Sequence, residues 1–299
     1  MAGLEHISVC ICTFKRPILL KRLLSRMDEL VTQDSFTYSI VVADNHPQQS
    51  AQALVDECSK RLRVRIAYCA EPNPNIAAAR NRALQNAEGE YVAFIDDDEL
   101  PVKEWLLELY TACKRFGVEG ILGPVKPYFD VEPPAWVKKG RFFERPDPPT
   151  GKRLEWAECR TGNVLFKRSI LALVDVPFRL QFGTAGEDMD FFRRMIDRGC
   201  VFLWCREAPA YELVPLERCR RGFLLKRALL RGSNFPKHPA GRVKSVLKSM
   251  VAVPCYTIAL PVLAACGHHV FLKYLIKLCD HASRLLAFAG WTVVTERET

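Results

Sequence analysis

The chain has 299 residues, 49% of them hydrophobic and 26% charged, a composition typical of a globular protein long enough for one large domain. Its formal net charge of +9 falls in the last hundred residues, where 15 Lys and Arg face 6 Asp and Glu. No basic-aromatic interleaving accompanies this charge, which argues against a nucleic-acid partner and favours an anionic membrane surface. The twelve cysteines lack metal-ligand spacing, so we expect reduced thiols in a cytosolic protein, without disulfides or zinc.

Strand and helix patterns alternate through the first part of the chain. Apolar runs rich in β-branched residues predict strands, and leucines at helical spacing predict the helix after the first of them. The expected strands are 6–14, 38–43 and 64–69, and the expected helices are 17–30, 48–61 and the Ala-rich 76–87. This order predicts an α/β fold with a mostly parallel, doubly wound sheet and right-handed crossovers.

The next expected strand, residues 91–95, runs directly into Asp96, Asp97 and Asp98. An apolar run of this kind is typical of a strand buried on both faces, but three unpaired carboxylates cannot belong to a core. In open α/β sheets, ligands bind beyond the carboxyl ends of the strands. Asp96 and Asp98 could both offer oxygens to one hard cation such as Mg²⁺. Taken alone, the acids could equally be a solvated turn.

The middle of the chain differs in composition from the regions on either side, and regular helix and strand patterns resume after it. Residues 124–151 hold seven prolines among several aromatic residues, which indicates either a mobile, acceptor-facing loop or a packed surface insertion. A strand is expected at 161–166 and another at 201–205. Between them, a Gly-rich loop at 183–186 opens an amphipathic helix with three acids in its first turn, more than the helix dipole alone explains. These acids are Glu187, Asp188 and Asp190.

An uncharged, mostly apolar run of 18 residues follows at 250–267, interrupted by Pro254 and Pro261. This length is at the short edge for a membrane-spanning helix, and basic residues flank it on both sides. We expect membrane contact through an in-plane amphipathic segment or a shallow re-entrant hairpin, with a soluble core hairpin as the alternative. The expected domains are therefore 1–235 and a membrane-associated helical region, 236–299.

Five motifs, taken together and in order, resemble the family-2 inverting glycosyltransferases of GT-A fold. The resemblance covers about residues 5 to 232, and the later pattern from Arg160 to Pro215 is similar to bacterial exopolysaccharide transferases of the succinoglycan type. The five motifs are VCICTFKRP from Val9, VVADN from Val41, NIAAARNRAL from Asn75, GEYVAFIDDD from Gly89 and Gly186-Glu187-Asp188.

The resemblance implies a nucleotide-sugar site with a divalent cation. Asp96 and Asp98 match the metal motif for Mg²⁺ or Mn²⁺, with Asp98 the stronger ligand and Asp97 in a supporting role. Asp44 matches the residue that accepts a ring N–H of uracil, which favours UDP-sugars. Further expected contacts to the nucleotide or its diphosphate are Thr13, Phe14, Arg16, Asn45, Arg80, Asp97, Arg218 and Arg221.

Direct displacement with inversion needs one base to take the proton of the acceptor hydroxyl. The family keeps it in the Glu-Asp pair, so we expect Asp188 as the base, kept ionised by the helix N-terminus, and Glu187 as a ligand of the acceptor hydroxyl. The sequence departs from the family pattern in two places. Glu212 stands where some members carry a histidine ligand, so either it substitutes or the metal relies on the aspartates and diphosphate. Asn75 replaces the usual Gly and tolerates the same left-handed backbone.

The implied function is transfer of a sugar, with glucose expected, from a UDP-sugar to a lipid-linked oligosaccharide in cell-surface polysaccharide biosynthesis. The implied place is the cytoplasmic face of the bacterial inner membrane. One alternative is a polyprenyl-phosphate glycosyltransferase, whose phosphate acceptor needs no strong base. A nucleotidyltransferase is disfavoured because no Gly-rich triphosphate loop follows the first strand. A non-catalytic sugar-nucleotide-binding scaffold is the third alternative, and the intact acids argue against it.

Overall fold

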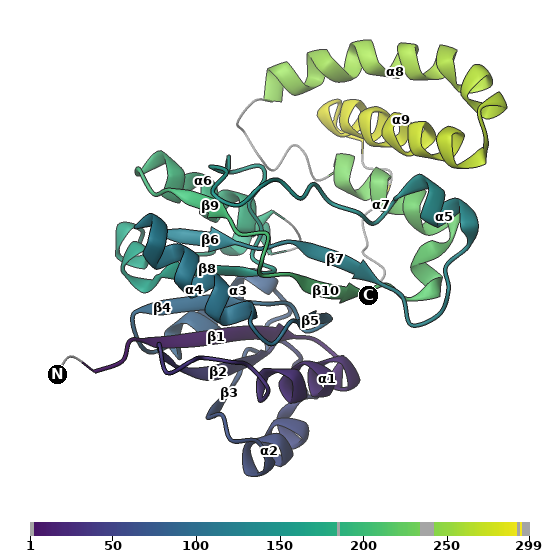
Figure 1. The fold of residues 1–299 in the computed structure, drawn as a ribbon. Coiled ribbons are helices and arrows are strands. Elements are labelled where there is room, and N and C mark those ends of the chain that lie inside the picture. Colours follow the sequence, from purple (N-terminus) through teal and green to yellow (C-terminus); the bar gives the residue numbers. More distant parts are fainter. Residues whose placement is uncertain (1–2, 184–185, 234–241, 292–293, 295–299) are drawn as a thin grey trace. The chain divides into compact units, whose positions relative to one another are not determined.

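The computed structural model describes residues 3–183, 186–233, 242–291 and 294. Its main sheet has seven strands in the order β3-β2-β1-β4-β8-β6-β9 (Figure 1). Neighbouring strands are parallel except where β8 meets β4 and β6, so the mostly parallel α/β sheet predicted from the sequence is confirmed. The strands are β1 (His6–Thr13), β2 (Thr37–Asp44), β3 (Ile66–Ala70), β4 (Tyr91–Phe94), β6 (Gly120–Leu122), β8 (Val164–Lys167) and β9 (Phe202–Trp204).

Helices cover both faces of this sheet because alternate strand residues point to opposite sides and both sets are apolar. On one face, Val9 and Val42 pack in a core with helices α1 (Pro17–Met27), α2 (Gln52–Arg61) and α4 (Trp105–Phe116). On the other face, Cys10 and Val41 pack in a second core with α3 (Ile76–Gln85) and α6 (Glu187–Asp197). The loops before α3 and α6 are in contact, since the backbone N–H of Ile76 donates to the carbonyl of Gly183 at 3.3 Å.

A smaller sheet, not expected from the sequence, has the order β5-β10-β7. Strand β5 (Glu99–Pro101) begins directly after the three aspartates, and β10 (Ala210–Leu213) pairs with it antiparallel. This pairing places Glu212 opposite Glu99. The proline-rich stretch contains β7 (Val125–Tyr128) and the short helix α5 (Ala135–Gly140). Two 3-10 helices, η1 (Arg168–Leu173) and η2 (Leu180–Phe182), follow β8.

The chain forms two compact units. The sheet unit comprises Met1–Lys126 and Arg145–Leu213, and the helical unit comprises Pro127–Glu144 and Val214–Thr299. The domain boundary expected between 235 and 236 lies outside the described residues. Besides α5, the helical unit contains η3 (Leu216–Cys219), α7 (Arg221–Ser233), α8 (Arg242–Ala265) and α9 (His268–Phe288).

Helix α8 is continuous through Pro254 and Pro261, the two prolines of the apolar run. Each proline removes one helical hydrogen bond, but the remaining ones and the packing of α8 on α9 hold the helix together. Its segment Ser245–Ala265 is long and apolar enough to cross a membrane and is only 6% buried. Exposed apolar side chains in α8 are Val243, Leu247, Met250, Val251, Ile258 and Val262.

Candidate active site

The turn after β4 is held by two residues from the end of β1. Asp97 is 5% exposed; its carboxylate accepts hydrogen bonds from Thr13 Oγ1 (2.8 Å) and Arg16 Nη1 (3.1 Å). Burial raises the pKa of Asp97 to about 6, although Arg16 opposes the shift. Arg16 Nη1 also lies 3.2 Å from Asp98 Oδ2. Thr13 and Arg16, expected at the nucleotide, are thus in contact with the aspartate turn.

Four carboxylates gather around this turn, and two of them come from the smaller sheet. Glu99 is 2% exposed, and burial raises its pKa well above the ordinary range, reinforced by Asp96, Asp98 and Glu212. Partial burial also raises the pKa of Asp96, with Arg80 opposing. Glu212 is paired with Arg145 at 2.6 Å. Glu99 was not predicted as a site residue, because its burial depends on β5, a strand of only three residues.

Such a concentration of negative charge fits a divalent cation better than it fits an empty turn. Within the described residues, no three His, Cys, Asp or Glu side chains are arranged as a ready-made metal site. A cation held by Asp96 and Asp98 would therefore take its remaining ligands from water or a diphosphate, which is the usual pattern for Mg²⁺.

Arg80 joins the aspartate turn to the acids of α6. Its guanidinium pairs with Glu187, lies 3.8 Å from Asp96 Oδ1 and stacks at 5.7 Å on the ring of Phe178. Arg80 and Glu187 are both buried, and burial raises the pKa of Glu187 while Arg80 opposes the shift. Glu187 Oε2 has no hydrogen-bond partner within the described residues. Arg80 is thus occupied by protein carboxylates in this conformation.

Asn75 starts the helix that carries Arg80, but not in the way expected. Its backbone is extended, with φ −151°, rather than left-handed. Its side chain caps α3 by accepting hydrogen bonds from the backbone N–H groups of Ala77 (2.9 Å) and Ala78 (3.2 Å). Asparagine is a favoured capping residue for this reason, so the left-handed interpretation was wrong.

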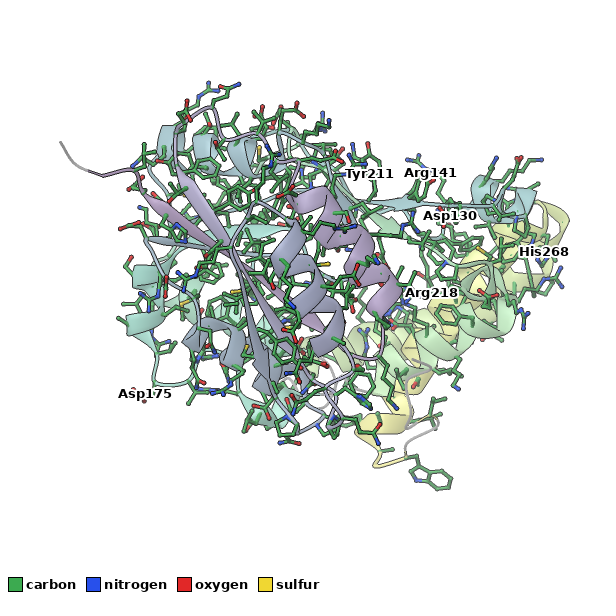
Figure 2. The ribbon with its side chains drawn as sticks, turned by 90° about the horizontal axis from the view of Figure 1, so that it is seen from below. Asp130, Arg141, Asp175, Tyr211, Arg218 and His268 are labelled. Atoms are coloured by element: carbon green, nitrogen blue, oxygen red, sulfur yellow. The ribbon has the colours of Figure 1, made fainter. Side chains whose placement is uncertain are left out.

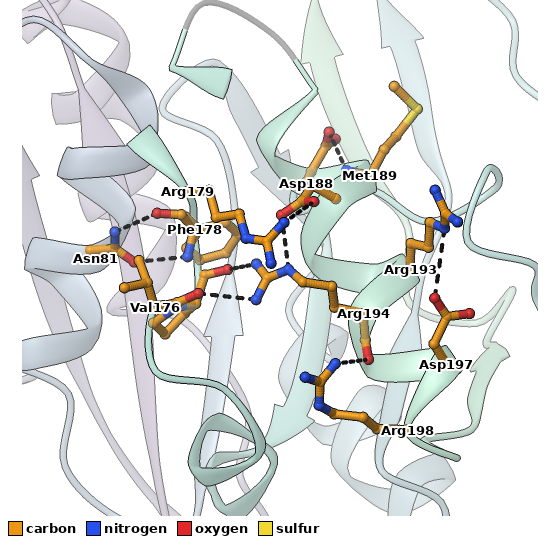
Figure 3. A network of polar contacts seen from close by, with 12 residues as sticks. Asn81, Val176, Phe178, Arg179, Asp188, Met189, Arg193, Arg194, Asp197 and Arg198 are labelled. Carbon is orange, nitrogen blue, oxygen red and sulfur yellow. Dashed lines mark hydrogen bonds and ion pairs between the residues drawn. The ribbon is translucent and has the colours of Figure 1, made fainter. Parts of the chain in front are cut away.

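The acids in the first turn of α6 have different partners: Glu187 pairs with Arg80, and Figure 3 shows the contacts of Asp188 and of Arg194. Asp190 pairs with Arg194 at 2.9 Å, and Arg194 also donates to the Val176 carbonyl, tying the helix to the preceding loop. Asp188 Oδ1 accepts from the backbone N–H of Met189 at 2.7 Å, and its Oδ2 lies 3.9 Å from Arg160 Nε. Asp190 is therefore structural, and Asp188 is the more available carboxylate. Residues 184–185 of the Gly-rich loop lie outside the described residues.

The end of β2 supplies a second polar turn beside the first. Asp44 is not exposed; its carboxylate accepts from the N–H groups of His46 (3.0 Å) and Ala51 (2.7 Å) and from the Tyr68 hydroxyl (3.2 Å). Asn45 donates to two carbonyls and accepts from the Asn75 N–H. Both side chains thus hold the turn in this conformation.

The other expected contacts are placed in two different units. Phe14, half-buried after β1, packs edge-to-face on His46 with ring centroids 5.4 Å apart. Arg218 lies in η3 of the helical unit (Figure 2), and Arg221 is the exposed first residue of α7. The sheet unit by itself therefore brings together all the expected site residues except Arg218 and Arg221.

The family follows from comparison with known proteins. A model described as "Glycosyl transferase family 2" matches residues 8–173, more than half of the chain. The chain belongs to glycosyltransferase family 2. This confirms the family resemblance, and the GT-A-like α/β fold agrees with it.

Individual relatives extend the match. Succinoglycan biosynthesis protein ExoM of Rhizobium meliloti (strain 1021) is 34% identical over 76% of this chain and 73% of the relative. Poly(ribitol-phosphate) beta-N-acetylglucosaminyltransferase TarP of Staphylococcus aureus (strain N315) is 27% identical over 63% of this chain and 56% of its own. A crystal structure of S. aureus TarS in complex with UDP-GlcNAc is 15% identical, with a TM-score of 0.54 over 95% of this chain and 92% of that chain. At this identity the likeness to TarS shows the fold and does not by itself show what this chain binds.

Proposed function

We propose that the chain transfers a sugar, with glucose expected, from a UDP-sugar to a lipid-linked oligosaccharide, with inversion at the anomeric carbon. The observation that carries the proposal is the connection through Arg80 of the acidic turn at Asp96 with the acids Glu187 and Asp188. A donor site and an acceptor site at one sheet edge are what a direct displacement needs. The relationship to ExoM supports a role in polysaccharide biosynthesis, and the UDP-GlcNAc bound by TarS supports a UDP-sugar donor.

In this mechanism Asp188 is the base. The oxygen of the acceptor hydroxyl forms a bond to the anomeric carbon, its proton passes to the Asp188 carboxylate, and the bond to the diphosphate breaks. UDP leaves with the electron pair. Glu187 Oε2, buried and without a partner among the described residues, would accept a hydrogen bond from another acceptor hydroxyl. Arg160 Nε lies 3.9 Å from Asp188 Oδ2, so the proposed base has a cation beside it.

Asp96 and Asp98 would hold Mg²⁺ or Mn²⁺, which when bound neutralises charge on the diphosphate leaving group. Asp97 would support them by anchoring Thr13 and Arg16. Phe14, Asp44 and Asn45 would shape the nucleotide end of the site. Asp44 already accepts three hydrogen bonds, one at Oδ1 and two at Oδ2, so a direct contact to uracil would use the remaining acceptor position at Oδ1. Glu212, held by Arg145, stays a candidate for the missing histidine ligand.

The helical unit would bring the enzyme to its acceptor. The exposed apolar residues of α8 suit the surface of the inner membrane at its cytoplasmic face, where a lipid-linked acceptor is found. Arg218 and Arg221 are proposed to contact the diphosphate or lipid headgroups. We retain 236–299 as the region responsible for membrane association.

The test is product analysis with UDP-sugars and increasing Mn²⁺. The expected products are free UDP and a glycosylated acceptor; release of pyrophosphate would identify a nucleotidyltransferase instead. Asp188→Asn should lower turnover about 10²- to 10⁴-fold without changing UDP affinity. Asp197→Asn, at the far end of the same helix, is the matched control and should be neutral. Near-normal turnover of Asp188→Asn would favour a polyprenyl-phosphate acceptor. UDP binding without metal dependence or turnover would favour the scaffold.

A further inference from the structure

His46 has an unusual environment for a histidine on the turn after β2. Its side chain is 8% exposed, and its backbone N–H is bound to Asp44. Its ring meets Phe14 at 87°, an edge-to-face contact that fixes the plane of the imidazole. Within the described part of the chain, Nδ1 is buried and has no hydrogen-bond partner.

A buried polar atom without a partner calls for an explanation, because most such atoms in folded proteins are paired. The polar groups next to His46 cannot supply the partner. The carboxylate of Asp44 holds the backbone of the turn and the Tyr68 hydroxyl, and the amide of Asn45 holds Glu71, Asn73 and Asn75. Among the described residues where β1 and β2 end, Nδ1 of His46 is thus a buried hydrogen-bonding atom without a partner.

We propose that His46 Nδ1 is the hydrogen-bond partner of the nucleobase of the donor and contributes to the preference for uracil. The assignment rests on the proposed function, which places a nucleotide at this edge of the sheet. Uracil presents a ring N–H between two carbonyls, so it offers a matching group whether Nδ1 donates or accepts the hydrogen bond. Cytosine presents an amino group and a bare ring nitrogen in place of one carbonyl and the N–H. At ring positions 3 and 4 the donor and acceptor of uracil are exchanged in cytosine, so a contact from Nδ1 that suits uracil at either position does not suit cytosine.

Two substitutions separate this role from a structural one. His46→Phe keeps an aromatic ring against Phe14 and removes Nδ1. His46→Asn loses the ring but keeps a polar atom close to the position of Nδ1. The measurement is calorimetric binding of UDP and of CDP to the full chain with Mn²⁺, together with the thermal midpoint of each variant without nucleotide.

His46→Phe should bind UDP about tenfold more weakly and lose most of the preference for UDP over CDP. His46→Asn should keep more of both. Without nucleotide, the thermal midpoint of His46→Phe should equal or exceed that of the wild type, because an unpaired buried polar atom has been removed. A structural histidine would not separate binding from stability in this way.

Three results would overturn the assignment. Unchanged UDP affinity and preference in His46→Phe would remove His46 from the base site and leave the proposed function intact. Equal losses in both variants, with a lowered thermal midpoint, would identify a packing role. A wild-type protein that binds no UDP would overturn the proposed function itself and this assignment with it.

Discussion

The two units leave opposite physical requirements unmet. In the sheet unit the strands are buried in apolar cores, and the unfavourable free energy lies in buried charges such as Asp97, Glu99 and Glu187. In the helical unit the buried polar groups Ser249 and His281 bond to each other at 2.9 Å, while apolar residues such as Ile258, 77% exposed, face outward. The first unit calls for counter-charges and the second for apolar surroundings. Under the proposed function, the donor would bring a diphosphate and a cation to the first unit, and the acceptor would bring a lipid to the second.

The largest expected effect comes from breaking the buried pair of the sheet unit. Arg80→Met leaves Glu187 buried without its counter-charge, which should lower the free energy of unfolding by about 3–5 kcal/mol. The double variant Arg80→Met/Glu187→Met removes both charges and should recover most of the loss. Urea unfolding of the full chain measures both. A single variant as stable as the wild type would mean that this unit does not depend on paired buried charge.

The second prediction concerns pH. The folded-state pKa of Asp97, about 6, lies above its ordinary value of 3.8 because burial disfavours the carboxylate. Its favourable contribution is therefore fully present below pH 3.8 and is lost as the pH rises through 6. Asp97→Asn has no such titration, so its stability relative to wild type should rise by on the order of 3 kcal/mol between about pH 4 and about pH 7. The measurement is urea unfolding of both proteins at several pH values. If their difference in free energy of unfolding did not change with pH, the raised pKa of Asp97 would be contradicted.

The third prediction compares two neighbours in the aspartate turn: Asp98, a proposed metal ligand, and Asp97, which holds the turn in place. Asp98→Asn should reduce turnover about 100-fold and shift the Mn²⁺ dependence to higher concentration, since it removes a proposed ligand. Asp97→Asn should be milder, because its side chain contacts Thr13 and Arg16 and is 5% exposed. Turnover measured against Mn²⁺ concentration decides. Equal losses in the two variants would mean that Asp97 acts at the metal as well.

The smallest effect tests the helical unit. Ile258→Glu puts a charge on the exposed face of α8 and should weaken sedimentation with anionic vesicles about tenfold. Ile18→Glu is a matched control, because Ile18 in α1 of the sheet unit is also 77% exposed. It should leave vesicle binding unchanged. If both variants lose vesicle binding equally, exposed apolar area anywhere on the chain would suffice, and α8 would have no special role.

Much of the sheet unit could be predicted because its signals are local. Strand β4 and its aspartates, the leucine spacing of α1 and the Ala-rich α3 each carry their pattern within a few residues. The partner of Arg80 could not be predicted in this way. Glu187 is 107 residues away in the sequence, and only the folded chain brings the two side chains into contact. Strands β5 and β10 are too short to show a period, which is why Glu99 was missed.

Asn75 was misinterpreted for a physical reason, and the two prolines of α8 show a related competition between local and tertiary effects. Asn75 satisfies either a left-handed turn or a helix cap, and the backbone N–H groups of α3 decide between them. Pro254 and Pro261 are strong helix breakers in water, but each removes only one hydrogen bond. In α8 the packing against α9 outweighs that loss.

The two prolines of α8 have a geometric consequence. They are seven residues apart, close to two full helical turns, so they lie on the same side of the helix. A proline bends a helix away from its own side, and two bends in the same direction add up to an arc. The withdrawn hydrogen bonds also leave the carbonyls of Met250 and Thr257 as polar notches about 10 Å apart along that side. These notches lie on the same side of the helix as the exposed residues Leu247, Val251 and Ile258, so the apolar face of α8 carries two polar interruptions.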